Sequence, residues 1–153
     1  RIRVGVFRTV VATWVLAAAL GALIIGLGTP IVQLFVGAGE QAVVAMAHQY
    51  LAINCALYPL LASLFVLRNA IQGLGSTGVP MLAGFMELVF RAAAGLFLVG
   101  SLGFVGVAVA APLAWVGALV PVVAAWFVHR GHLLERERGA LEPYVALPAL
   151  AAA

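Results

Sequence analysis

The chain has 153 residues, of which 65% are hydrophobic and only 8% are charged. An ordinary soluble domain carries about 25% charged residues, so this composition excludes a water-exposed globular surface. The eight basic residues, all arginine, are scattered around the expected helix ends and form no basic face of the kind that binds nucleic acid. The single cysteine, Cys55, offers neither a disulfide framework nor a metal cluster. The composition therefore predicts a protein embedded in a lipid bilayer.

Four apolar runs are each long enough to cross a bilayer as a helix, which takes roughly 20 residues. They cover about residues 9–28, 42–67, 80–99 and 105–128. Pro30 and the glycines near it are expected to end the first helix, and a polar loop at residues 69–78 is expected to follow the second. Pro80 then stands in a first helical turn, where its missing N–H costs nothing. The runs lack the alternation of barrel strands, so we expect an all-α, polytopic membrane helix bundle with four transmembrane helices.

The arginines indicate how the chain is oriented in the membrane. Three precede the first run, one follows the second, and three follow the fourth, whereas the other two loops carry none. By the positive-inside rule, both termini and the loop between the second and third runs are cytoplasmic. We therefore expect residues 1–130 to be the transmembrane part and residues 131–153 to be a cytoplasmic tail.

Glu87 and Arg91 are the candidate functional charges, because both fall inside the third run. They are four residues apart, so they lie on one helix face and are expected to pair. Charges near the bilayer centre cost about 2.5 to 3.5 kcal/mol each, so both should face a bundle interior or an aqueous cavity. The pair is either part of an ion or substrate pathway, or a static brace of its helix.

Asn54 and Tyr58 are further pathway candidates in the second run, beside Pro59. Proline kinks a helix and frees a carbonyl, which makes Pro59 a hinge candidate and can turn a polar group toward a cavity. The alternative is an interhelical hydrogen bond for Asn54 and ordinary packing for Tyr58. Pro112 and Pro121 are likewise either hinges of the fourth helix or tolerated there.

Other motifs carry no chemistry. The glycine-rich loop Gly73–Gly78 lacks the lysine of a phosphate-binding loop. His129 and His132 have a metal-like spacing, but they lie among charged residues and are expected to belong to a solvated tail, so no metal site is predicted. The chain contains no metalloprotease motif, serine elbow or paired carboxylates, and we predict that it is not an enzyme.

Several short motifs follow one another in the order and spacing of a known transporter family. They are Arg1, Arg3 and Gly5; Pro30 to Phe35; Tyr50 and Leu51; Gln72 to Thr77 with Pro80 and Met81; Arg91; and Gly103 to Val107 with Pro112 and Trp115. In these residues the chain resembles the multidrug and toxic compound extrusion (MATE) family, in the last four helices of its second lobe. The resemblance covers residues 1 to about 130.

The resemblance implies a fragment of a twelve-helix, two-lobe antiporter in the cell inner membrane. Such a protein expels small organic cations or amphipathic drugs in exchange for Na⁺ or H⁺, by rocking of the lobes around a central cavity. No cofactor is expected beside the coupling ion, Na⁺ or H⁺, and the N-terminal lobe, absent from this chain, would be its partner. Some members bind the coupling cation through an acid on the helix corresponding to residues 42–67, which here contains none. Glu87 is then the only candidate in this lobe, unless coupling belongs to the other lobe.

Two other functions are alternatives to the multidrug antiporter. A lipid-linked oligosaccharide flippase of the same superfamily would carry several basic residues for pyrophosphate, whereas Arg91 is alone within the spans. A non-transporting membrane scaffold subunit would tolerate leucine in place of Glu87 and Arg91.

Overall fold

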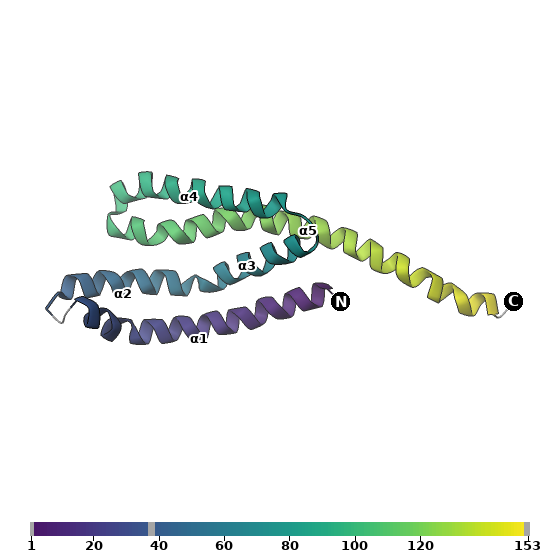
Figure 1. The fold of residues 1–153 in the computed structure, drawn as a ribbon, viewed down its shortest axis with the longest axis horizontal. Helices are drawn as coiled ribbons and strands as arrows, with labels where there is room; N and C mark the ends of the chain where they lie inside the picture. The colour runs from purple at the N-terminus through teal and green to yellow at the C-terminus, as the bar shows by residue number, and fades with distance from the viewer. Residues whose placement is uncertain (1, 37–38, 152–153) are drawn as a thin grey trace.

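The computed structural model describes the backbone of residues 2–36 and 39–151 and the side chains of residues 2–36 and 39–131. Every regular element in this part of the chain is a helix (Figure 1). The helices are α1 (Ile2–Val36), α2 (Gln41–Ala56), α3 (Tyr58–Gly73), α4 (Gly78–Leu102) and α5 (Phe104–Ala151). The expected all-α fold is confirmed.

The described residues also contain the expected membrane spans. α1, α4 and the Phe104–Gly131 part of α5 are each long and apolar enough to cross a bilayer. α2 and α3 pass the same test only together, as one span bent by 46°. The polytopic helical bundle with four spans is therefore realised by five helices, one span being broken in two.

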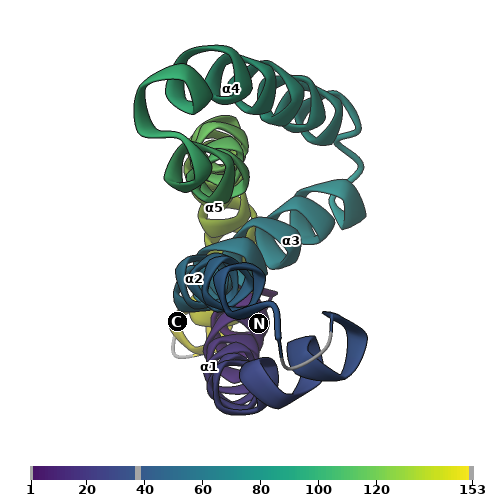
Figure 2. The ribbon, with the colours of Figure 1, turned by 90° about the vertical axis from the view of Figure 1, so that its left-hand side faces the viewer.

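The first helix does not end before Pro30, as the sequence suggested. α1 continues through Pro30 to Val36, and Figure 2 shows its last, dark blue turns directed away from the axis of the purple part. A proline removes only one helical hydrogen bond and bends the helix. Because an apolar environment offers the remaining backbone groups no other partners, the helix resumes beyond the bend.

The loop expected at residues 69–78 is shorter in the structure. α3 extends to Gly73 and α4 begins at Gly78, which leaves residues 74–77 between them. The extra turn of α3 carries Ile71, which is fully buried, so its packing favours continued helix. The N–H of Leu74 closes this turn on the carbonyl of Ala70 at 3.1 Å.

The fourth helix does not end at Val128. The backbone of α5 is helical to Ala151 and projects past the other helices (Figure 1). The stretch after Gly131 is rich in leucine, alanine, glutamate and arginine, which are strong helix formers. The tail expected at residues 131–153 is thus helical as far as it is described.

The four spans stand in a row. α1 packs on α2 and α3, these pack on α5, and α5 packs on α4, an order that can be followed in Figure 2. The start of α1, the α3–α4 loop and the part of α5 near residue 130 lie together at one end of the helices along their long axes, on the right in Figure 1. We call it the arginine-bearing end of the row. Arg3 and Arg8 of α1, Arg68 of α3 and Arg130 of α5 lie in or near these segments, so the fold brings to one end the arginines that the predicted topology places on one side of the membrane.

The core lies where α3, α4 and α5 converge near this end. Its buried residues are Leu64, Ile71, Ala83, Trp115, Ala118 and Val122. α5 is the best buried span, whereas α1 and α4 expose most of their apolar side chains. The described chain therefore leaves wide apolar faces for lipid or for further protein.

Two glycines let α4 and α5 approach closely. A Cβ added at Gly106 would collide with the carbonyl of Leu98, and one added at Gly117 would lie 2.5 Å from the Phe90 ring. Small residues at such crossings allow membrane helices to pack through van der Waals contact. The α4–α5 hairpin is thus built on contacts that only glycine permits.

We expect Gly106→Ala to destabilise the full-length protein by about 1 to 3 kcal/mol, the usual cost of overpacking. The matched control is Gly100→Ala, because a Cβ at Gly100 meets nothing within 4 Å. Thermal unfolding in detergent should show a lower midpoint for Gly106→Ala and an unchanged or higher midpoint for Gly100→Ala. Equal midpoints would contradict the close approach described above.

Candidate functional site

Glu87 and Arg91 form the expected ion pair on α4. Nη2 of Arg91 donates a hydrogen bond to Oε1 of Glu87 at 2.9 Å. The side chain of Glu87 is 28% exposed and that of Arg91 is 53% exposed. The pairing is confirmed, and the guanidinium is the more open of the two groups.

The pair lies at the edge of the α4–α5 contact. Ala83 and Ala94 are buried, and they lie four residues before and seven residues after Glu87, hence on the same side of the helix. Glu87 is therefore half-covered on the packed side, and Arg91 extends from its margin toward the open face. The described residues leave this charged face without a cover.

An open charge at this depth restricts what can adjoin it. Arg91 is the fourteenth of the 25 residues of α4, so it lies near the middle of the span. A charged residue at mid-membrane costs about 2.5 to 3.5 kcal/mol if it must be accommodated there. The pair consequently requires other protein or a water-filled space against this face, rather than acyl chains.

Asn54 is buried in the contact between α2 and α5, with only 5% of its surface exposed. Its Nδ2 donates to the carbonyl of Tyr50 at 2.9 Å and to the carbonyl of Ala108 at 3.2 Å. Within α5 the carbonyl of Ala108 would normally accept from residue 112, but this residue is proline and has no N–H. Asn54 thus supplies the donor that Pro112 removes. This is the interhelical hydrogen bond that the sequence left open as an alternative.

The bend of the second span lies at Leu57, directly before Tyr58 and Pro59. Pro59 stands in the first turn of α3, where a helix does not need its N–H, so the proline starts a new helix instead of kinking a continuous one. The Tyr58 ring packs against Trp115 with centroids 6.4 Å apart and planes tilted by 45°.

Tyr58 also lines a groove between α1 and α3, of about 330 Å³, whose walls are almost entirely apolar. The fold therefore brings Tyr58 to α5 on one side and to this groove on the other. Pro112 is buried and Pro121 is half-buried, and α5 continues as helix through both. Whether these prolines or Pro59 act as hinges stays a prediction.

One polar contact was not predicted from the sequence. Nε1 of Trp14 on α1 donates to Oγ of Ser63 on α3 at 2.7 Å, and Ser63 donates to the carbonyl of Pro59 at 2.9 Å. Tryptophan and serine inside apolar runs were the only available signal, and 49 residues separate them. The contact ties α1 to the start of α3, next to the bend.

The described residues contain no group of three or more histidine, cysteine or acidic side chains that could hold a metal ion. Nδ1 of His129 lies 2.9 Å from the carbonyl of Ala125, one turn earlier in α5. The side chain of His132, the other half of the metal-like spacing, lies outside the described residues.

Asn54→Leu should destabilise the full-length protein, because the carbonyl of Ala108 would lose its donor. Measured coupling energies of such membrane hydrogen bonds average about 0.6 kcal/mol and reach about 1.7 kcal/mol. Adding Pro112→Ala restores an N–H inside α5, so the double variant should lose less stability than the two single losses combined. Thermal unfolding of the two single variants and the double variant in detergent completes a double-mutant cycle. If the stability losses of the single variants simply add up in the double variant, the link between Asn54 and Pro112 is contradicted.

Arg91→Gln should cost about 1 to 3 kcal/mol, because it leaves the Glu87 carboxylate in the span without its partner. Glu87→Gln should act in the same direction. The variant with both changes removes both charges and should recover at least half of the loss. Unfolding midpoints of the three variants in detergent test this, and a double variant less stable than either single variant would contradict it.

A comparison with models of known protein families agrees with the transmembrane helices and the polar residues described above. The MatE family model matches residues 1–97 of the 153, a stretch that includes α1, α2, α3, most of α4, Asn54 and the Glu87–Arg91 pair. Searches of curated proteins and of solved structures found no match. A match over more than half of the chain, together with apolar helices long enough to span a bilayer several times, identifies the chain as a multi-pass membrane protein that belongs to the MatE family of transporters.

Proposed function

We propose that the chain is the C-terminal part of the second lobe of a multidrug antiporter. In this proposal the whole protein expels small organic cations or amphipathic drugs across the cell inner membrane, in exchange for Na⁺ or H⁺. Membership of the MatE family supports transport in general. The Glu87–Arg91 pair on the open face of α4 is the observation that carries the more specific proposal.

The exposure of the Glu87–Arg91 pair fits a helix that lines a cavity. An ion pair buried among helices of one lobe would only brace them, whereas this pair is reachable from one side. A carboxylate at mid-membrane offers electrostatic attraction to an organic cation or to Na⁺. Glu87 is therefore the proposed cation contact, and Arg91 holds its side chain through the 2.9 Å hydrogen bond.

The row of helices supports a partner on this face. A single row of spans cannot by itself enclose a central substrate cavity against α4, and the described side chains leave α4 largely uncovered. The proposed partner is the N-terminal lobe of the same protein, which would supply the opposite wall. In transporters of this kind the substrate site lies near the midplane between such repeats, which is also the depth of Arg91.

The proposed orientation has both termini and the α3–α4 loop in the cytoplasm. The arginines at the start of α1, at the end of α3 and after the membrane part of α5 support it, because they gather at one end of the row (Figure 1). The positive-inside rule assigns that end to the cytoplasmic side.

Ethidium efflux from vesicles containing the full-length protein tests the proposal. An imposed Na⁺ or proton gradient should drive efflux, and Glu87→Gln should slow it about tenfold, equivalent to about 1.4 kcal/mol. The matched control is Glu40→Gln, which removes the same charge from an exposed side chain at the start of α2 and should leave efflux unchanged. Absence of efflux with either gradient would contradict antiport.

The variant Glu87→Arg with Arg91→Glu separates a cation contact from a brace. It keeps an ion pair at the same spacing, so the protein should remain folded in detergent. If Glu87 contacts the cation, moving the carboxylate by one helical turn should slow efflux as strongly as Glu87→Gln. Normal efflux in this variant would mean that the pair serves only to brace α4.

A further inference from the structure

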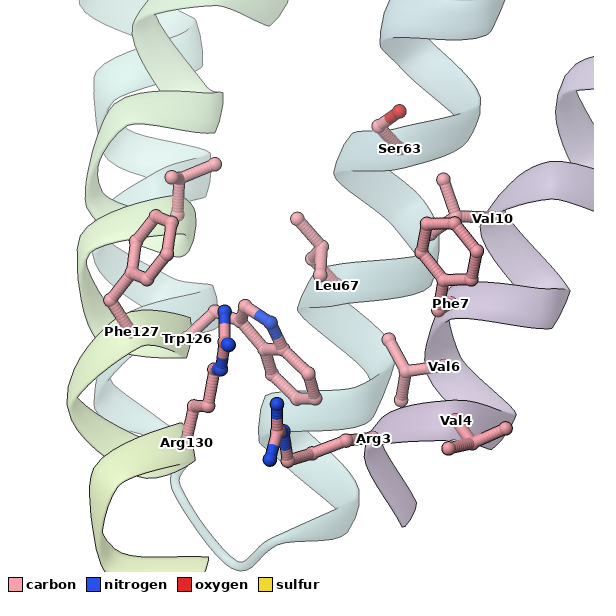
Figure 3. Close-up of a pocket in the computed structure, with 11 residues that line it drawn as sticks. Arg3, Val4, Val6, Phe7, Val10, Ser63, Leu67, Trp126, Phe127 and Arg130 are labelled. Carbon is pink, nitrogen blue, oxygen red and sulfur yellow. The ribbon is translucent and has the colours of Figure 1, made fainter. Parts of the chain in front are cut away.

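A cavity of about 510 Å³ opens between α1, α3 and α5 at the arginine-bearing end of the row. Its charged part is formed by Arg3 of α1 and Arg130 of α5, with Ser63 of α3 as a further polar lining residue, and Figure 3 shows both guanidinium groups directed toward the space beside the Trp126 ring. The other walls are mostly apolar and include Phe7, Val10, Leu67 and Phe127. The cavity is therefore basic in one part and apolar in the rest.

We propose that this cavity binds one anionic phospholipid, with the phosphate of its headgroup between Arg3 and Arg130. The inference does not rest on drug antiport, because it needs only the arrangement of these helices in a bilayer.

The charges of the cavity call for an anion. Two guanidinium groups directed into one space repel each other unless a negative group lies between them. Among the described side chains the only carboxylates are Glu40, at the opposite end of the row, and Glu87, which is bound to Arg91. The planar fork of arginine donors matches the oxygens of a phosphate.

The position of the cavity selects a lipid over a soluble anion. Arg3 lies in the first turn of α1, and Arg130 lies at the end of the membrane-spanning part of α5, so both are at headgroup depth. Trp126, one turn earlier in α5, has the position of an interfacial aromatic residue. Val10 and Leu67 continue the cavity toward the apolar interior, where an acyl chain can lie and a free phosphate would leave the space unfilled.

Basic pockets between membrane helices on the cytoplasmic side are known to bind anionic lipid headgroups. Here the lipid would connect α1 with α5, which stand on opposite sides of α3. The physical effect would be to hold α1, the least buried of the described spans, against the other helices at this end.

Quenching of Trp126 fluorescence by brominated lipids tests the proposal. The full-length protein is placed in phosphatidylcholine nanodiscs that contain increasing fractions of dibrominated phosphatidylglycerol or dibrominated phosphatidylcholine. The Trp126 signal is obtained as the difference between the unmodified protein and Trp126→Phe. Each arginine near an anionic headgroup contributes a factor of about five in binding affinity. Half-quenching should therefore need a roughly twentyfold lower fraction of dibrominated phosphatidylglycerol than of dibrominated phosphatidylcholine.

Arg3→Gln and Arg130→Gln should each reduce this preference about fivefold. The matched control is Arg8→Gln, which removes an exposed arginine of the same helix that does not line the cavity and should leave the preference unchanged. Arg3→Lys serves where Arg3→Gln does not fold, and it should retain part of the preference because it keeps the charge but loses the planar fork.

Three results would overturn the proposal. One is half-quenching at the same fraction of both lipids. Another is an effect of Arg8→Gln as large as that of Arg3→Gln, which would indicate general surface attraction. The third is relief of quenching by millimolar inorganic phosphate, which would indicate a site for a soluble anion. All of these are equilibrium measurements without an ion gradient, so they are independent of whether the protein transports drugs.

Discussion

Hydrocarbon offers no hydrogen-bond partner, so every polar group inside the spans of this protein must be satisfied by the protein itself. The contact between Asn54 and the carbonyl of Ala108 follows from this constraint. Pro112 removes the donor that α5 would have supplied, and the amide of a different helix replaces it at 3.2 Å. The proline and the asparagine are therefore one structural unit, although 58 positions separate them in the sequence.

The same constraint explains the broken second span. With Pro59 in the first turn of α3, the chain ends one helix at Ala56 and starts another at Tyr58, and Leu57 closes the break by donating to the carbonyl of Asn54 at 3.1 Å. Asn54 thus serves the bend through its backbone and α5 through its side chain. Trp14 and Ser63 add a tie from α1 just beyond the bend. The bend is consequently held by contacts from both neighbouring helices.

The charged side chains show where the surface of the described chain needs a partner beside it. Glu87 and Arg91 satisfy each other, but their open face at mid-span requires protein or water beside it. Arg3 and Arg130 stand at headgroup depth, where lipid phosphate is available. The two sites differ in depth, and this difference separates a proposed substrate pathway between lobes from a proposed lipid site at the membrane surface.

The sequence alone determined the membrane environment, the four spans, the pairing of Glu87 with Arg91 and the family, because hydrophobic length, helical spacing and local motifs are properties of neighbouring residues. It placed helix ends wrongly at Pro30, at residue 69 and at Val128, since a proline, a glycine or a polar stretch marks only a possible end and the surroundings decide whether the helix continues. Only the tertiary structure decided that Asn54 serves Pro112, that Trp14 meets Ser63, and that Arg3 and Arg130 share one cavity. These contacts join residues far apart in the chain, and no local pattern specifies which helices become neighbours.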